Sequence, residues 1–179
     1  MQRWLIIAMV VAAVALAEGL APFANLWSAQ GKQTKPAATK LSAPEQPFAE
    51  PRSAQDKALF DAANHERESR RLPRLKWSAA LASAARLHAQ KMAQKNTLSH
   101  QFPGEPDMGM RIRMAGIRFR AVAENVAQGP SAAVIHAQWM NSPPHRANLL
   151  DPDFDSIGIA VVERNRQLFA VQDFSQASP

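Results

Sequence analysis

The segment over residues 139–150, which reads Trp-Met-Asn-Ser-Pro-Pro-His-Arg-Ala-Asn-Leu-Leu, constrains the fold more than any other part of the chain. The pattern before it predicts a helix over 131–141. Two consecutive prolines must end that helix, because proline fixes φ and biases the preceding residue away from the α region. We therefore expect Ser142 and Pro143 to form a stiff corner. His145 follows this corner, so the backbone would hold its ring in place, as a ring that binds or transfers a group requires.

Residues 1–27 predict an export signal. Arg3 precedes an uninterrupted apolar run from Trp4 to Ala17, which is short for a bilayer crossing but normal for the hydrophobic region of a signal peptide. Ala15 and Ala17 supply the small residues needed for cleavage before residue 18. An N-terminal membrane anchor is the alternative interpretation. Both interpretations place the rest of the chain outside the cytoplasm, as a secreted or periplasmic protein.

Residues 28–54 are rich in Ala, Pro, Gln, Lys and Ser, which predicts a flexible linker, because such a composition does not repay the entropy of ordering. The globular domain then covers about residues 55–175, the size of one domain. The chain contains no cysteine. That absence excludes a disulfide scaffold, a thiolate metal site and a cysteine nucleophile, and in an exported chain it suits a bacterial envelope.

The net charge of +6 at pH 7 indicates a solvated basic face or attraction to anionic envelope components. The chain has no Tyr and no alternation of aromatic with basic residues. We therefore expect no nucleic-acid partner, and membrane association only through the N-terminus.

The domain mixes helices and strands without the βαβ periodicity of a parallel sheet, which predicts the α+β class with helices packed on a small sheet. Capping residues at Ser53 and Ser78 mark the starts of two helices. The expected elements are helices over about 53–70, 78–95, 110–115 and 131–141, an extended link over 72–77, and strands over 119–127, 156–162 and 167–174 with a turn at 164–165.

Three polar residues far apart in the sequence are candidates for one ligand cleft. His100 follows the second helix, and His145 follows the proline corner. Glu124 lies in a predicted strand among apolar neighbours, where a carboxylate needs a partner. The two imidazoles could bind a divalent cation such as zinc, or the three groups could form a general acid/base set. The remaining histidines, at 65, 88 and 136, are expected to be structural or surface residues.

Familiar hydrolase motifs are absent from the sequence. It contains no Gly-x-Ser-x-Gly, no His-Glu-x-x-His and no glycine-rich phosphate loop. Ser99 lies beside His100, and Ser142 lies near His145, but adjacency in sequence does not establish a hydrogen bond. No catalytic residue is assigned.

Several blocks, in this order, resemble the CAP superfamily of cysteine-rich secretory proteins, antigen 5 and plant pathogenesis-related proteins, and within it the compact bacterial SCP-domain branch. The resemblance covers about residues 55–175, and the series is far more specific than any single block. The blocks are Asn64-His65-x-Arg67, Leu72-Pro73-x-Leu75-x-Trp77, Ala85-x-x-His88-Ala89-x-x-Met92, Ser99-His100, Glu124-Asn125-Val126-Ala127, Trp139 to Leu150 and Ile157-Gly158-Ile159.

This resemblance implies a three-layer α-β-α sandwich of the CAP/SCP type and a cleft lined by two histidines and two acids. The histidines would be His100 and His145, and one acid would be Glu124. At the place expected for the second acid this chain has Ser142, so a four-ligand site becomes three unless the acid at 105 or 107 takes part. Further motif residues are expected to be structural, namely Asn64, Arg67, Trp77, Asn125, Trp139, Arg146 and Asn148.

Three hypotheses about function follow. The first is an exported, non-enzymatic binding module whose cleft takes a lipid, a wall fragment or a peptide, with zinc or another divalent cation as a candidate cofactor. The second is a hydrolase acting on peptide or cell-wall bonds. The third is a structural envelope protein in which the polar cluster holds loops together. Family members are similar in fold and diverse in function, so the fold alone does not choose among these hypotheses.

Overall fold

The computed structural model describes residues 50–177. The predicted signal peptide or anchor and most of the predicted linker lie outside these described residues. The elements run in the order α1 (Ala54–Glu68), β1 (Lys76–Trp77), α2 (Ala79–Lys95), α3 (Met108–Met114), β2 (Phe119–Gly129), α4 (Ala132–Asn141), α5 (Pro143–Leu150), β3 (Ser156–Arg164) and β4 (Gln167–Ala177).

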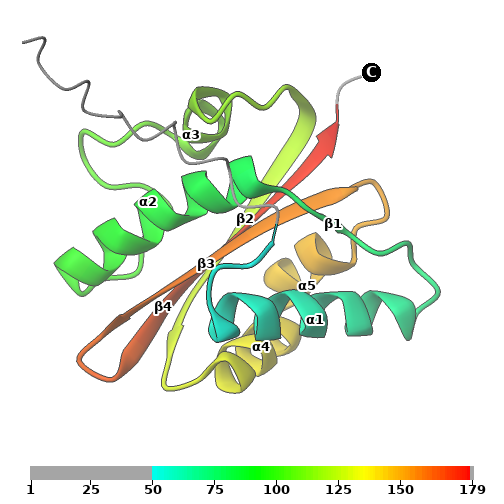
Figure 1. The fold of residues 1–179 in the computed structure, drawn as a ribbon, viewed down its shortest axis with the longest axis horizontal. Coiled ribbons are helices and arrows are strands. Elements are labelled where there is room, and N and C mark those ends of the chain that lie inside the picture. The colour runs from blue at the N-terminus through cyan, green and yellow to red at the C-terminus, as the bar shows by residue number, and fades with distance from the viewer. Residues whose placement is uncertain (1–49, 178–179) are drawn as a thin grey trace, which may run out of the picture. The chain divides into compact units, whose positions relative to one another are not determined.

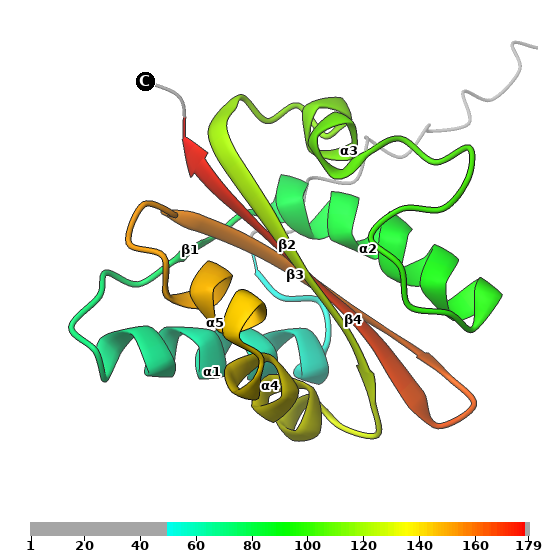
Figure 2. The same cartoon turned by 180° about the vertical axis from the view of Figure 1, so that it is seen from behind.

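One mixed sheet lies at the centre of the described domain, with strand order β1-β3-β4-β2. Strand β1 pairs with β3 in parallel, whereas β4 pairs with β3 and β2 antiparallel. Helices α2 and α3 cover one face, and α1, α4 and α5 cover the other (Figures 1 and 2). The predicted α+β class and three-layer α-β-α architecture are confirmed.

All four predicted helices form, and local capping explains where they begin. The Ser53 and Ser78 side chains accept hydrogen bonds from backbone N–H groups in the first turns of α1 and α2. Helix α3 begins two residues before the predicted start, because the Asp107 carboxylate accepts a hydrogen bond from the Met110 N–H at 2.7 Å. The strands are longer than predicted, since β4 pairs with a neighbour on each side.

The proline pair has a different role from the expected one. Ser142 alone is extended, with φ −98° and ψ 115°, while Pro143 and Pro144 form the first turn of helix α5. Proline is well suited to that place, since the first helical N–H groups have no partner within the helix and φ is already near the helical value. His145 therefore lies in the first turn of a helix and not in a loop after a corner.

The buried apolar side chains of the described residues form three clusters. The side chains of Leu59, Trp139 and Phe174 belong to the largest cluster, under α1, α4 and α5. Helix α2 is rich in alanine, and its backbone packs directly against the sheet. A Cβ added at Gly158 would lie 2.1 Å from the Ala82 backbone nitrogen. The glycine therefore permits α2 to contact β3 directly.

Asn64 and Arg67 of α1 hold the neighbouring chain segments in place through hydrogen bonds to their backbone. Arg67 is fully buried. Its guanidinium donates hydrogen bonds to four backbone carbonyl oxygens, those of Pro73 (2.8 Å), Leu149 (3.0 Å), Asp151 (2.8 Å) and Phe154 (3.2 Å). Asn64 exchanges two hydrogen bonds with the backbone of Leu75. Arg67 thus holds the end of α5 and the loop that follows it.

Among the described residues, no helix has the length and apolar character needed to cross a membrane.

Candidate functional site

The candidate site is built around Glu124 on the edge strand β2. Its side chain is 2 % exposed. One carboxylate oxygen, Oε1, is 2.8 Å from His100 Nδ1, and the other, Oε2, accepts a hydrogen bond from Arg111 Nη2. A buried carboxylate therefore has a partner on each oxygen, which is the condition that the sequence predicted for Glu124.

Arg111 on α3 is the residue of this site that sequence reasoning missed. Its side chain is 6 % exposed, and Nη1 donates to the carbonyl oxygens of His100 (3.1 Å) and Pro106 (3.2 Å). The same guanidinium thus pairs with Glu124 and fixes the backbone that carries His100. The available signal was Glu124 itself, because a carboxylate in a buried strand calls for a cation, and arginine is the usual one.

Asp173 is a second buried acid at this site, and the sequence analysis did not identify it either. It lies directly opposite Glu124 in the antiparallel pairing of β2 with β4. It is fully buried under α2. Burial raises the pKa of Asp173 well above its usual range, and the negative charge of Glu124 raises it further. The neutral, protonated form of Asp173 is therefore favoured.

The two histidines have opposite proton affinities. The hydrogen bond to Glu124 raises the pKa of His100 and outweighs the partial burial that lowers it. Partial burial lowers the pKa of His145, and the charge of His100 lowers it further. Over a range of pH around 6.5, His100 is thus the charged ring and His145 the neutral ring. His100 is also open to solvent, with 61 % of its side chain exposed.

His145 reaches this edge from the opposite layer of the sandwich. Asn125, the neighbour of Glu124, points to the α5 face and donates a hydrogen bond from Nδ2 to the His145 carbonyl oxygen at 3.0 Å. Asn148 donates to Asn125 Oδ1 at 3.0 Å, which ties α5 to β2 a second time. Because β2 is the edge strand, a loop from one layer and a helix from the other meet around it.

The proposed second acid is not supplied by the nearby carboxylates. Glu105 is buried; its Oε1 is 2.9 Å from His88 Nδ1, and its Oε2 accepts from the Phe102 N–H at 3.0 Å. Asp107 caps α3. Ser142 separates α4 from α5, and its side chain makes no capping hydrogen bond to α5. These residues therefore add no ionised oxygen to His100, Glu124 and His145.

The donor set does not fit a zinc site of the usual kind. Catalytic zinc takes three protein ligands and structural zinc four. Both oxygens of Glu124 are already engaged, by His100 and Arg111. Among residues 50–177, no group of three or more His, Asp or Glu is arranged to hold a metal ion.

Several of the remaining motif residues lie in structural surroundings, whereas two are exposed. His88 is fully buried, with Nε2 2.7 Å from the Ser99 carbonyl oxygen. Trp139 is fully buried in the largest cluster, and Trp77 packs edge-on against Phe60. Ser99 donates its hydroxyl hydrogen to the Gln101 carbonyl oxygen, so this hydroxyl belongs to a local turn. His65 and Arg146 are exposed.

The fold and the ordered motifs define a CAP-type α-β-α sandwich, and comparison with known proteins gives the family. A sequence model of the Cysteine-rich secretory protein family (CAP) matches residues 60–174. The chain belongs to this family.

Similar proteins come from bacteria. YkwD of Bacillus subtilis is 38 % identical over 116 residues, which cover 62 % of this chain and 44 % of YkwD. An extracellular SCP-domain protein of Bacillus anthracis is 29 % identical, with a TM-score of 0.64 over 68 % of this chain and 40 % of that one. An outer surface protein of Borrelia burgdorferi is 23 % identical, with a TM-score of 0.65 over 69 % of this chain and 93 % of that one. The chain thus spans less than half of the length of the two Bacillus proteins.

One distant structure bears on the metal expectation. NaASP2, whose crystal structure was determined with Zn²⁺, is 11 % identical, with a TM-score of 0.51 over 76 % of this chain and 85 % of that one. At this identity the likeness extends to the fold alone. The zinc of NaASP2 is therefore a property of that protein.

Proposed function

We propose that this CAP domain is a non-enzymatic binding module that acts outside the cytoplasm, and that its His100 site takes a carboxylate or phosphate group of a cell-wall fragment or peptide. The location is supported by the extracellular and outer-surface relatives and by the apolar run at residues 4–17. The ligand class rests on one observation, the hydrogen-bonded series Arg111–Glu124–His100.

That series prepares one donor for an anion. Because Nδ1 of His100 is engaged by Glu124, a protonated His100 presents Nε2–H as its second donor. The raised pKa of His100 and its exposed side chain favour such a charged donor at the surface. A hydrogen bond from an imidazolium to an anionic oxygen is stronger than a neutral one. Neutral His145, fixed through its backbone by Asn125, adds a second polar group nearby.

The same geometry favours binding over hydrolysis, and a polar ligand over a lipid chain. The hydroxyl of Ser99, the serine beside His100, is committed to the Gln101 carbonyl oxygen. The proposed contacts of the site are imidazole N–H groups at a sheet edge, which suit anionic oxygens and not an acyl chain.

Calorimetry tests the proposal with a muropeptide that carries free carboxylates and with the same muropeptide after amidation. The full chain should bind the first more tightly than the second. His100→Gln should weaken the first by roughly tenfold or more, the effect of losing a charge-assisted hydrogen bond. His65→Gln is the matched control, because His65 is an exposed histidine on α1 and should leave binding unchanged.

Three outcomes would contradict the proposal. Equal binding of the two muropeptides would show that the ligand's carboxylates are not recognised. An unchanged affinity of His100→Gln would show that the ligand does not bind at His100. Binding that disappears with a chelator and returns with zinc would show that a metal mediates it. Cleavage products detected by mass spectrometry would support the hydrolase hypothesis instead.

A further inference from the structure

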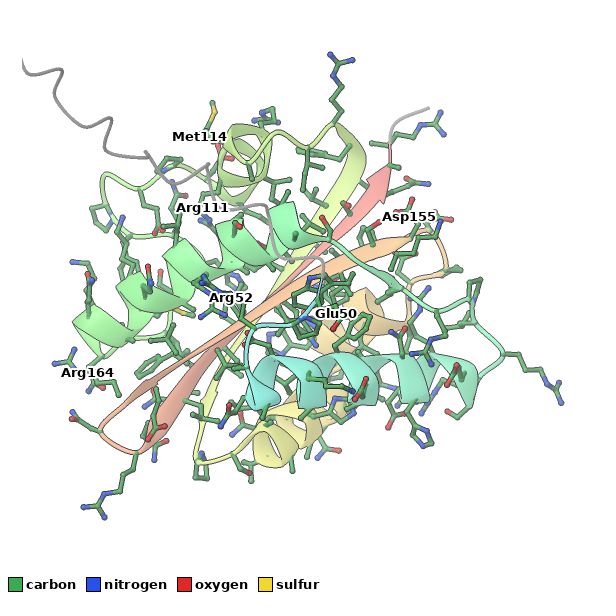
Figure 3. All side chains as sticks on the ribbon, in the orientation of Figure 1. Glu50, Arg52, Arg111, Met114, Asp155 and Arg164 are labelled. Carbon is green, nitrogen blue, oxygen red and sulfur yellow. The ribbon has the colours of Figure 1, made fainter. Side chains whose placement is uncertain are left out.

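A hollow lies between α2 and α3, and Arg111 is one of its lining residues, whereas Glu124 is not. It measures about 460 Å³, and its lining is mostly apolar, including Ala84 and Leu87 of α2, and Met114 of α3 with Ala115 after it. Figure 3 shows Arg111 and Met114, both carried by α3 beside α2. Its size and lining fall within the range of small-molecule sites, which run from roughly 300 to 1,000 Å³.

The walls of this hollow hold the two most exposed large apolar side chains of the described residues. Met114 is 72 % exposed and Leu87 69 % exposed, whereas Met110, Leu98 and Val134 are 40–44 % exposed. Single exposed apolar residues are common on proteins. Two that face one apolar hollow from two different helices form a patch, and such patches mark binding sites.

The polar groups of the hollow offer positive charge. Glu105 also lines it, but the carboxylate of this residue is bonded to His88 and to the Phe102 N–H. The Lys91 ammonium forms a long ion pair with Glu105, at 3.8 Å and without a hydrogen bond, and the Lys91 side chain is 36 % exposed. Arg111 lines the hollow with a nearly buried side chain whose Nε–H has no hydrogen-bond partner among the described residues. The Arg111 guanidinium thus keeps its positive charge at the wall of the hollow with one donor unused.

We propose that the hollow between α2 and α3 is a second binding site, which takes one single-chain anionic amphiphile as a free molecule. The apolar chain would lie against Leu87 and Met114, and the anionic head would lie toward Lys91 and Arg111. The positive charges of Lys91 and Arg111 favour a negatively charged head group. The volume of the hollow accommodates a single chain of medium length. The two sites share Arg111, but the side chains proposed to contact the His100 ligand, His100 and His145, do not line this hollow.

The test uses decanoate below its micelle concentration, with decyltrimethylammonium as the probe of equal chain length and opposite charge. Calorimetry on the full chain should show that decanoate binds more tightly than the cation. Leu87→Gln and Met114→Gln should each weaken decanoate by roughly five- to tenfold, as expected when part of an apolar contact is lost. Lys91→Gln should reduce the preference for decanoate over the cation.

Met110→Gln is the matched control, because Met110 is an exposed methionine of the same helix that does not line the hollow. It should bind decanoate as the unchanged protein does, and so should His100→Gln, which separates this site from the first. Equal affinity for the two probes would contradict the proposed preference for an anionic head group. Decanoate affinity that is unchanged in Leu87→Gln and Met114→Gln would show that decanoate does not bind in this hollow. Association with phosphatidylglycerol vesicles, without binding of monomeric decanoate, would show a membrane-docking face and overturn the free ligand.

Discussion

Arg67 and Arg111 are both buried arginines, but their surroundings differ in kind. Arg67 donates only to backbone carbonyl oxygens, four in number, from segments that flank the α1 and α5 layer. Arg111 pairs with the titratable carboxylate of Glu124, holds the backbone of an exposed histidine and retains one N–H without a partner among the described residues. The first arrangement is complete within the fold, whereas the second is linked to solvent and to proton binding.

This difference indicates how a structural polar cluster can be told from a functional one. Carbonyl acceptors do not titrate, so the hydrogen bonds of Arg67 should be independent of pH. Glu124 and His100 share a proton-dependent interaction, and the neighbouring Asp173 has a raised pKa. We therefore expect changes at Arg67 to affect the free energy of unfolding alone, and changes around Arg111 to affect proton binding and ligand binding as well.

The largest effect is expected from Arg67→Ala. This change leaves four backbone carbonyl oxygens without their donor, and two of these hydrogen bonds, to Leu149 and Phe154, are buried. It should lower the free energy of unfolding by roughly 3–5 kcal/mol. Urea denaturation measures the loss, and Arg67→Lys should lose less. Arg146→Ala serves as the control, because Arg146 is an exposed arginine on α5 and its removal should change stability by less than about 0.5 kcal/mol. A small loss for Arg67→Ala, or a shifted pKa of His100, would remove the contrast between the two arginines.

Glu124→Gln should have the second largest effect and should change two quantities together. Arg111 would keep a buried charge without its carboxylate, which should cost roughly 2–4 kcal/mol in a urea titration. The pKa of His100 should fall, because the hydrogen bond to Glu124 is the main cause of its elevation. Nuclear magnetic resonance titration of the ring protons measures this shift, with exposed His65 as the internal reference.

The sign of the pH dependence follows from the same pair. A raised folded pKa means that the contribution of His100 to stability is complete below its unfolded pKa of about 6.5 and is lost as the pH rises through the folded value. Glu124→Gln should diminish that loss. An unchanged His100 titration curve in this variant would show that the Glu124 contact does not operate in solution.

Much of the fold could be predicted because its signals are local. Ser53 and Ser78 cap helices within three residues of themselves, and the hydrophobic periods mark the faces. The β3–β4 turn was predicted one residue too early, since Asn165 and Arg166 occupy it with φ of 51° and 58°. Both residues have positive φ, as in the two-residue turns that join adjacent strands and fix their register.

The candidate site was less accessible to sequence reasoning because its contacts are long-range. No short turn sets the register of β2 against β4, so nothing local placed Asp173 opposite Glu124. Arg111 lies 13 residues before Glu124 on a short helix, and no periodicity relates the two. Residue chemistry suggested His100, Glu124 and His145 as candidates, and the resemblance to the CAP superfamily pointed to the same three residues. It did not supply the arginine and the second buried acid that surround Glu124.

Asp173→Asn tests the buried acid and should stabilise the protein modestly. Because the folded pKa of Asp173 is raised, the native state binds more protons than the unfolded state at pH values above about 3.9, and stability falls as the pH rises toward the folded pKa. Asparagine removes this penalty, so the variant should gain about 1 kcal/mol at pH 8, with a gain that shrinks as the pH is lowered toward 4. Thermal unfolding across this range measures it. A gain that is constant with pH would indicate a packing effect and not the ionisation of Asp173.

The smallest effect on stability is expected from His145→Ala, and this variant separates the binding hypothesis from the structural one. The α5 backbone is held by Asn125 and Asn148 through the His145 carbonyl oxygen and the Asn125 amide, which the substitution retains. Within residues 50–177 the His145 ring itself makes no hydrogen bond, so its removal should cost less than about 1 kcal/mol. If the His100 site binds anions, muropeptide affinity should nevertheless fall. A loss of about 1–3 kcal/mol with unchanged affinity would instead identify His145 as a structural residue, whose place in the family motif reflects the packing of α5 against β2.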